Sequence, residues 1–297
     1  MSISAGLLIA TLTMPTFATN GYLPHGYGIR AQGMGGAGLA LPQDTIAAAS
    51  NPAGMALIGD RIDLGLSWFR PQREATISGS PLPPVNGKFD ADKTENFLIP
   101  EFGYNRKITS DFSLGVSVYG HGGMNTDYDR PIPLLGNSRP GVDLAQLFVA
   151  PTIAWQITPK HSLGLAVNFA YQRFEAKGLQ NFDNPAFTKH PGKVTNNGHD
   201  SSIGAGIHLG WIGQISDSVS VGAAYQSKTY MSEFDDYKGL FADDGDFDIP
   251  AHYGVGIAIK ATPKLTVVAD VERIFYSDVN SVGNDSVGKL LTGQQLG

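Results

Sequence analysis

Three glycines, Gly33, Gly35 and Gly38, have the spacing G-x-G-x-x-G that lets a backbone approach the pyrophosphate of a dinucleotide. That chemistry needs a buried strand before the glycines and a long helix after them. The preceding letters, TNGYLPHGYGIRAQ, have no strand pattern, and Pro42 follows the glycines closely. We therefore interpret the glycines as backbone bends in a compact segment, and we predict no cofactor.

The other residue types that carry chemistry do not form a recognised site. The seven histidines include no H-x-x-x-H pair, the chain contains no cysteine, and no G-x-S-x-G sequence is present. The acidic run DDGDFD contains Asp243, Asp244, Asp246 and Asp248 but lacks the spacing and the terminal glutamate of an EF-hand. It fits a solvated outer loop, with a Ca²⁺ or lipopolysaccharide-bridging site as the alternative. We predict no catalytic residues and no metal centre.

The composition indicates an exported protein without a nucleic-acid partner. Of 297 residues only 16% are charged, and 27 acidic against 21 basic residues give a net charge of −6. No run reaches the roughly 18 apolar residues of a membrane-spanning helix. Residues 1–18, MSISAGLLIATLTMPTFA, resemble a secretory signal with cleavage after about Ala18, the alternative being a buried N-terminal strand or helix. Export without cysteine fits a periplasmic or outer-membrane protein.

After about residue 60, apolar residues alternate with small or neutral polar ones. In HSLGLAVNFAYQ one face carries Leu163, Leu165, Val167, Phe169 and Tyr171. The other face carries glycine, alanine, asparagine and glutamine, and four further segments repeat the pattern. A period of two predicts strands, and a small, uncharged second face favours a crowded barrel interior over bulk water. The apolar face then points to lipid, as in an outer-membrane β-barrel.

The alternation predicts an all-β, antiparallel transmembrane barrel. The strands are expected near residues 60–70, 97–106, 111–121, 144–157, 161–175, 201–214, 218–230, 249–260 and 264–277. Short and long connections alternate, as they do between the two sides of an outer-membrane barrel. An odd count of about nine leaves unpaired edges in lipid, so we expect that further strands follow in a longer chain.

Between the signal and the first strand, the residues predict a compact plug. PQDTIAAAS reads as a short helix with Asp44 at its N-terminal end. Asn51 can cap a second turn that begins with Pro52 and Ala53. The small alanines fit a narrow lumen, and Gly35 and Gly36 permit tight bends beside them.

This plug segment, followed by the strand RIDLGLSWFRP, resembles the N-terminal hatch and first strand of the FadL family of outer-membrane transporters. The NPA triplet of Asn51, Pro52 and Ala53 stands where the family's hatch motif stands. DFSLGVSVYGHGGMNTDYD resembles the family's third strand, and DIPAHYGVGIAIKATPKLTVVADVERIFYSDVN a later strand pair. The resemblance implies a hatch over 19–59, part of a barrel of about fourteen strands over 60–297, and transport of fatty acids or aromatic hydrocarbons.

The resemblance also implies a route. It comprises capture at an outer loop, movement of the hatch, and lateral exit through a gap at a kinked third strand. Gly120, Gly122 and Gly123 follow Tyr119 in that strand and could mark the kink, the alternative being an ordinary strand end.

Two further sets of residues could contact a substrate. Ile132, Leu134 and Leu135 in a long outer loop fit a capture groove, or else a small cluster that holds the loop closed. A fatty carboxylate would need a cation, for which the candidates are Arg30, Arg173 and Lys177. An aromatic hydrocarbon would need none.

Two other functions remain open. An outer-membrane lipid hydrolase could use His161 or His208, of which His208 faces inward by the alternation. A structural or adhesive barrel would need no ligand. In every case we expect a monomeric barrel surrounded by outer-membrane lipid and lipopolysaccharide, with no nucleic-acid partner.

Overall fold

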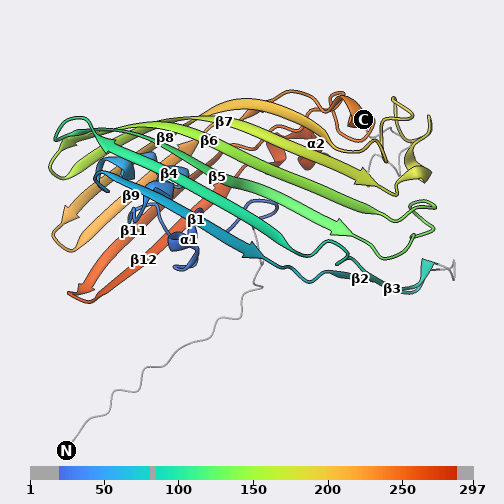
Figure 1. Ribbon diagram of the computed structural model, residues 1–297, viewed down its shortest axis with the longest axis horizontal. Helices are drawn as coiled ribbons and strands as arrows, with labels where there is room; N and C mark the ends of the chain where they lie inside the picture. The colour runs from blue at the N-terminus through green and yellow to red at the C-terminus, as the bar shows by residue number, and fades with distance from the viewer. Residues whose placement is uncertain (1–19, 81–84, 286–297) are drawn as a thin grey trace, which may run out of the picture.

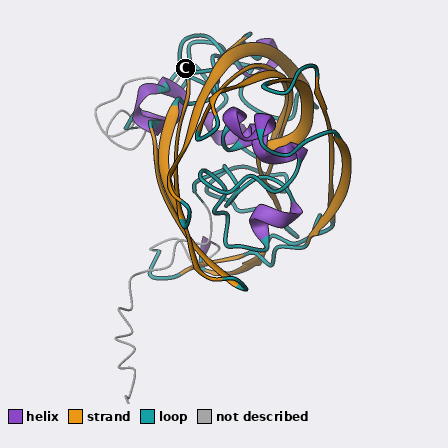
Figure 2. Ribbon diagram, turned by 90° about the vertical axis from the view of Figure 1, so that its left-hand side faces the viewer, coloured by secondary structure: helices purple, strands orange, loops and turns teal. Residues whose placement is uncertain are grey.

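The computed structural model describes residues 20–80 and 85–285, and the predicted signal over 1–18 lies outside them. One large antiparallel sheet curves into a wall, and the N-terminal segment lies inside it (Figures 1 and 2). No helix in the described ranges is long and apolar enough to cross a bilayer. The long strands therefore dominate the architecture.

Nine strands follow one another across the main sheet in chain order. They are β1 (Arg61–Phe69), β4 (Phe97–Lys107), β5 (Phe112–Asp127), β6 (Gly141–Thr158), β7 (His161–Lys177), β8 (Asp200–Ser216), β9 (Val219–Gln226), β11 (His252–Thr262) and β12 (Leu265–Ile274). The short β10 (Tyr230–Met231) also pairs with β8, and β2 (Glu74–Ile77) and β3 (Gly87–Asp90) form a separate hairpin. Each predicted strand coincides with one strand of this path, so the period-two pattern located the wall.

Helical pieces are short and lie outside the wall strands. In the N-terminal segment they are α1 (Ile29–Gln32), η1 (Thr45–Ala49) and η2 (Pro52–Ala56), and at the outer end η4 (Gln180–Phe182), η5 (Asp235–Tyr237), η6 (Tyr276–Asp278) and α2 (Asn280–Gly283).

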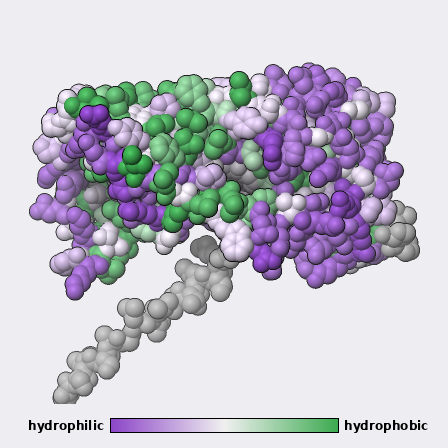
Figure 3. Space-filling model, in the orientation of Figure 1, coloured by the Kyte–Doolittle hydropathy of each residue, from purple (hydrophilic) through white to green (hydrophobic). Residues whose placement is uncertain are grey.

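The two faces of the wall differ as the alternation predicts. In β7, Phe169 and Tyr171 are exposed on the outside, whereas Asn168 and Gln172 are fully buried on the inside. In β1, Leu64 is 80% exposed. Figure 3 shows the apolar side chains gathered over one half of the long axis and polar residues over the half that carries β2, β3 and the long loops. So wide an apolar surface is stable in contact with lipid and not with water.

The N-terminal segment forms the turns that the sequence predicts. Asp44 caps η1, its Oδ1 accepting the Ile46 N–H at 2.9 Å, and Asn51 caps η2, its Oδ1 accepting the Ala53 N–H at 3.1 Å. Both turns are 3₁₀ helices and are completely buried. Their alanines and Ile46 pack against the inner wall, so the core of the molecule lies within the curve of the sheet.

Glycines on the inner wall make room for this segment. Among the described residues, a Cβ would overlap the N-terminal segment at seven of these glycines: Gly103 with Thr45, Gly115 with Met55, Gly164 with Pro52 and Ala53, Gly210 with Asn51, and Gly222, Gly254 and Gly256 with Leu39. The glycines come from β4, β5, β7, β8, β9 and β11. Strand glycines weaken a sheet but permit close approach of another backbone, and here they let one segment contact six strands.

Replacing Gly210 by valine is expected to displace the N-terminal segment while the wall still forms. The added side chain would occupy the position of the Asn51 amide. Limited proteolysis of the full chain in detergent should then cleave within residues 20–59, and heat-modifiability on a gel should persist. Ala145→Val, which adds bulk to an exposed wall residue, is the control and should leave the segment protected. Equal protection of both variants would contradict this packing.

Candidate functional site

Carboxylates of the wall hold the backbone of the N-terminal segment. They come from β1, β4 and β12, and each accepts N–H groups that the segment's short turns leave free. Asp63 accepts from Thr45 N and Oγ1, both at 3.0 Å; Glu101 accepts from Ile29 N at 3.1 Å; and Asp270 accepts from Gly38 N at 2.7 Å and Leu39 N at 2.9 Å. The segment is thus fastened at points spread around the wall.

Asn51 connects the segment to the wall at its most buried point. Its Nδ2 donates to the carbonyl oxygens of Leu39 at 2.8 Å and Trp211 at 3.0 Å, and it lies 3.4 Å from that of Ala223. The side chain is only 1% exposed. One amide therefore satisfies backbone groups of the segment, β8 and β9 that have no access to water.

The other predicted hatch residues lie beside it or in a bend. Pro52 and Ala53 are buried against Gly164 of β7. Gly35 and Gly36 follow α1 with φ of 70° and 92°, and the Gly36 backbone packs on His25. These positive φ values are the reason for glycine in this bend.

The wall changes its pairing at the predicted kink in β5. The β4–β5 ladder runs from Lys107 and Ser113 to Phe102 and Val118. Beyond Val118, within the described residues, β5 continues to Asp127 with its ladder partners on β6, and Asp127 at its end also forms an isolated bridge with Asp92. The strand therefore does not end at the glycines, and an interval opens between β4 and β5.

A β-bulge lies in this interval. The β5–β6 register shifts between Gly120 and Gly122, so His121 is the extra residue. Above the bulge, Arg73 donates from Nε to Asp92 and from Nη1 to the Asn125 carbonyl, which ties the β2–β3 region to the outer end of β5. The interval between β4 and β5 is thus bounded by the end of their ladder at Val118 and by the contacts of Arg73 with the outer end of β5.

The N-terminal segment covers the interval from inside. The Gly123 N–H donates to the Tyr22 carbonyl at 2.9 Å, and a Cβ on Gly122 would lie 3.0 Å from the same oxygen. The Tyr27 hydroxyl donates to the His121 carbonyl, 3.4 Å away. The Tyr27 ring also stacks on the His121 imidazole, with centroids 5.4 Å apart. Backbone groups freed by the bulge are thus paired by a segment about a hundred residues away in sequence.

The interior beside the bulge is lined by aromatic and imidazole rings. His121 is fully buried, and the Phe148 ring stacks on it with centroids 3.9 Å apart. Tyr119 packs on Phe148, and His252 of β11 lies 6.4 Å from His121 between centroids. The sequence reasoning gave no role to His121 or to His252, although the alternation places both inward.

The two histidines considered for hydrolysis lie on opposite faces of the wall. His161 stacks on the outward ring of Trp211 with centroids 5.8 Å apart. His208 is fully buried inside, next to the Ala48 backbone and 6.1 Å from His252 between centroids. They cannot contribute to one reaction site.

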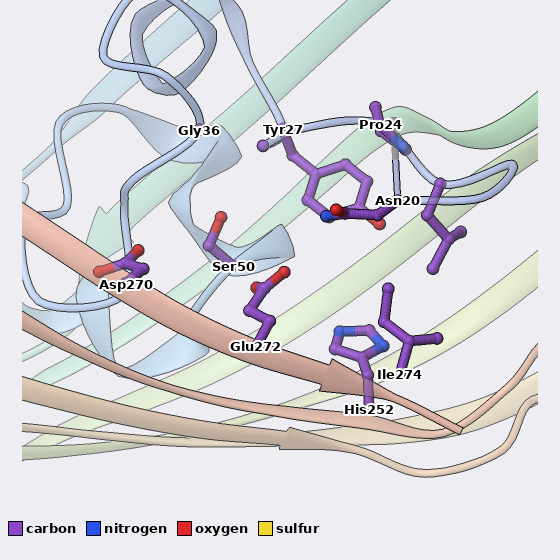
Figure 4. Close-up of a pocket in the computed structure, with 11 residues that line it drawn as sticks. Asn20, Pro24, Tyr27, Gly36, Ser50, His252, Asp270, Glu272 and Ile274 are labelled. Atoms are coloured by element: carbon purple, nitrogen blue, oxygen red, sulfur yellow. The ribbon is translucent and has the colours of Figure 1, made fainter. Parts of the chain in front are cut away.

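A small cavity separates the N-terminal segment from β11 and β12 (Figure 4). Its volume is about 10 Å³, room for about one water molecule. Polar side chains reach it from both sides: Asn20 and Ser50 from the segment, and His252, Asp270 and Glu272 from the wall. The N-terminal segment therefore lies close against β11 and β12 at this point.

Each candidate cation already has a partner. Arg30 Nη1 donates to the Gln43 carbonyl at 3.1 Å, and its Nε lies 3.9 Å from Asp44. At the outer end of β7, Arg173 pairs with Asp143 at 3.1 Å and Lys177 with Glu175 at 3.5 Å. The structure does not bring the three cations together.

The predicted capture residues differ in exposure. Leu134 is 54% exposed, Leu135 is half-buried, and Ile132 is only 4% exposed. The Ile132 carbonyl also accepts the N–H groups of Leu135 at 2.8 Å and Gly136 at 3.1 Å. The expectation of three exposed apolar residues is therefore wrong for Ile132, which holds its own loop together.

Other outer loops form an aromatic cluster that covers the outer end of the interior. It comprises Leu144, Phe174, Ala176, Phe234, Tyr237, Phe241 and Phe247, all buried. Tyr22 of the N-terminal segment packs against it, with its ring 5.8 Å from Phe247 between centroids. The segment that covers the bulge thus also contacts the outer cover.

Most carboxylates of the acidic run have protein partners. Asp243 accepts from Asn280 at 2.6 Å, Asp244 pairs with His190 at 2.7 Å, and Asp248 accepts from Met231 N at 2.8 Å. In the described ranges, no group of His, Asp and Glu side chains has an arrangement suited to a metal ion. The run is a folded outer loop.

These features define the class of protein to which the chain belongs. A curved antiparallel sheet with an apolar outside and a small, polar inside, folded around its own N-terminal segment, is a transmembrane β-barrel architecture. The family model described as "Outer membrane protein transport protein (OMPP1/FadL/TodX)" matches residues 10–295. The chain belongs to this family and is a bacterial outer-membrane protein.

Several solved structures of other proteins share the fold of this chain. The Ralstonia pickettii toluene transporter TbuX is 20% identical with a TM-score of 0.68, over 86% of this chain and 73% of that one. The Pseudomonas putida toluene transporter TodX is 18% identical with a TM-score of 0.62, over 85% and 71%. A Pseudomonas aeruginosa FadL homologue is 18% identical with a TM-score of 0.56, over 86% and 70%. No curated protein sequence gives a significant match.

Asn51→Ala is expected to loosen the N-terminal segment without preventing barrel formation. The substitution removes the donor that Asn51 supplies to the buried carbonyls of Leu39 and Trp211, at a cost of about 1 kcal/mol for each hydrogen bond. Hydrogen exchange within residues 38–56 should accelerate while the barrel remains heat-modifiable. Asn137→Ala, on an exposed loop, is the control. Loss of the folded barrel in Asn51→Ala would show that the residue supports the wall instead.

Asp246 gives the outer loop a defined pH dependence. Burial and the neighbouring Asp248 raise its pKa from 3.8 to about 6. The folded loop therefore binds this proton more tightly than the unfolded chain, and the resulting stability is complete below about pH 4 and lost as pH rises through 6. Asp246→Asn should make the loop harder to open than wild type at pH 8, with little difference at pH 4.

The measurement is the free energy of loop opening from hydrogen exchange, corrected for intrinsic rates at each pH. Asp217→Asn, in an exposed turn, should show no such pH-dependent gain. A variant that is less stable than wild type at pH 8 would contradict the assignment.

Proposed function

We propose that this protein carries small, neutral hydrophobic molecules across the outer membrane by lateral exit through the β4–β5 interval. The observation that carries the proposal is the end of the β4–β5 ladder at Val118, followed by a bulge that the N-terminal segment covers from inside. The family description names transport, and the similar structures include toluene transporters and a monoaromatic hydrocarbon channel.

A lateral exit suits such solutes. Each buried CH₂ group favours hydrocarbon over water by about 0.8 kcal/mol, so a water-filled pore offers a hydrophobic molecule no advantage. A gap in the wall delivers it directly to the lipid, and the concentration gradient is the only driving force required. A plug is needed to prevent leakage of polar solutes through the same barrel.

We assign residues 19–59 to the hatch and 60–297 to the barrel. A molecule captured at the outer loops, where Leu134 is the exposed apolar side chain, displaces the aromatic cluster and enters the interior. Release of Tyr22 and Tyr27 from β5 then opens the interval. The carboxylate anchors on β1, β4 and β12 keep the rest of the hatch attached. The barrel acts as a monomer in lipid and lipopolysaccharide.

Charge favours neutral aromatic hydrocarbons over fatty acids. Arg30, Arg173 and Lys177 are engaged by protein oxygens, so a fatty carboxylate would have to displace an existing partner. The inner wall itself contributes Asp270 and Glu272 beside the N-terminal segment, and these carboxylates oppose a second negative charge.

The experiment is uptake of labelled toluene and labelled oleate by cells that produce the full-length protein. Toluene should enter faster than in an empty-vector strain, and oleate should show a smaller increase or none. Toluene uptake equal to the empty-vector strain would overturn the proposed function. Faster uptake of oleate than of toluene would overturn the assignment of a neutral substrate.

Gly122→Val should slow toluene uptake severalfold. Its Cβ would lie 2.6 Å from Gln146 Oε1 and 3.0 Å from the Tyr22 carbonyl, so the added side chain fills the interval. Ala145→Val adds similar bulk to an exposed position on the partner strand and should transport at the wild-type rate. An unchanged rate in Gly122→Val, with the barrel folded, would remove this glycine from the exit.

A further inference from the structure

We infer that the ring-lined chamber inside the bulge binds a neutral aromatic molecule that carries a hydroxyl group, such as a phenol. The chamber consists of Tyr27, Tyr119, His121, Phe148, His208 and His252. The inference rests on the proposed function and narrows it, because it names which aromatic molecules the interior favours.

The chamber has the shape of an aromatic stack. The His121 ring is nearly parallel to those of Tyr27 and Phe148, with interplanar angles of 7° and 2°. Tyr27 belongs to the N-terminal segment, whereas Phe148 belongs to β6. When the segment withdraws, the exposed face of the imidazole is left for another flat ring. Stacking of this kind selects aromatic molecules over aliphatic chains.

The chamber also holds polar atoms that have no hydrogen-bond partner within residues 20–80 and 85–285. They are Tyr119 Oη, both ring nitrogens of His121, both ring nitrogens of His208, and His252 Nδ1. All four side chains are at least nine-tenths buried. Such atoms are rare in folded proteins, and they point to a ligand that supplies the missing bonds.

The chemistry of these atoms matches a hydroxyl group. A neutral imidazole has one nitrogen that donates and one that accepts, and a tyrosine hydroxyl does both. A phenol offers one donor and acceptor on the edge of a flat ring, so it can stack and bond at once. Toluene stacks equally well but leaves the polar atoms unpaired, and a site built for a hydroxyl discriminates against an analogue that lacks it.

A metal ion is the other ligand that imidazoles bind. Within residues 20–80 and 85–285, however, the His, Asp and Glu side chains do not form a metal-binding arrangement. The His252 centroid lies 6.4 Å from that of His121 and 6.1 Å from that of His208, and the two pairs of rings are inclined by 24° and 65°. The geometry therefore favours the aromatic ligand.

The test is isothermal titration of p-cresol and toluene into the full chain in detergent, with empty micelles as the blank. The wild-type protein should bind p-cresol about tenfold or more tightly than toluene, since each additional satisfied hydrogen bond contributes on this scale. His121→Phe keeps the stacking ring and removes both nitrogens, so the preference should fall to about twofold or less. His161→Phe, on the outer wall against Trp211, is the matched control and should keep the wild-type preference.

Tyr119→Phe provides a second variant if His121→Phe fails to fold, and it should also reduce the preference. Equal affinities of the wild-type protein for the two ligands, or a preference that survives both substitutions, would overturn the inference. Zn²⁺ binding that His121→Phe removes and p-cresol does not compete with would also overturn it, because the cluster would then be a metal site.

Uptake separates this inference from the proposed function. Cells that take up toluene and p-cresol at equal rates above the empty-vector strain retain the transport proposal and contradict the phenol preference. Cells that take up neither compound contradict transport itself.

Discussion

Backbone hydrogen bonding in lipid is the constraint on which the whole arrangement depends. Water is absent from the hydrocarbon region, so each N–H and C=O group needs a partner within the protein. Most of the wall meets this need by strand pairing. β5 does not, because its ladder with β4 ends at Val118 and a bulge follows. The Tyr22 carbonyl accepts the Gly123 N–H, so the N-terminal segment supplies a partner that β4 does not. The proposed function relies on this contact, because movement of the segment would expose the gap.

The inner wall contacts the N-terminal segment closely without adding it to the sheet as a strand. Wall glycines remove the side chains that would keep it away, and Asn51 satisfies carbonyls on both sides with one amide. Carboxylates on β1, β4 and β12 bind its N–H groups individually. Single hydrogen bonds of this kind each contribute about 1 kcal/mol net, so part of the segment can detach while the remainder stays anchored.

Sequence reasoning located the features that depend on the pattern of neighbouring residues. Alternation placed the wall strands, because one face meets lipid and the other a crowded interior, and Asp44 and Asn51 identified the two capped turns before the structure was known. It could not place features that arise from contacts between distant segments. β5 extends beyond Val118 to Asp127 through pairing with β6 and contact with the N-terminal segment, and the stacking of His121 on Tyr27 and Phe148 brings together three distant parts of the chain. Ile132 was expected on the surface because its letters alone do not reveal that its loop folds back over it. The roles of the hatch and of the exit remain predictions.

A reversible cross-link tests the central claim, that the N-terminal segment closes the β4–β5 interval. The chain has no cysteine, so Leu23→Cys with Gly122→Cys creates a single pair. A Cβ at position 122 would lie 3.2 Å from the Leu23 side chain, close enough for a disulfide after small adjustment. The account predicts that cells with the oxidised pair take up no more toluene than the empty-vector strain. After reduction, uptake should rise to the rate of the Gly122→Cys single variant. Equal uptake by the oxidised and reduced pair would show that the segment does not control the exit.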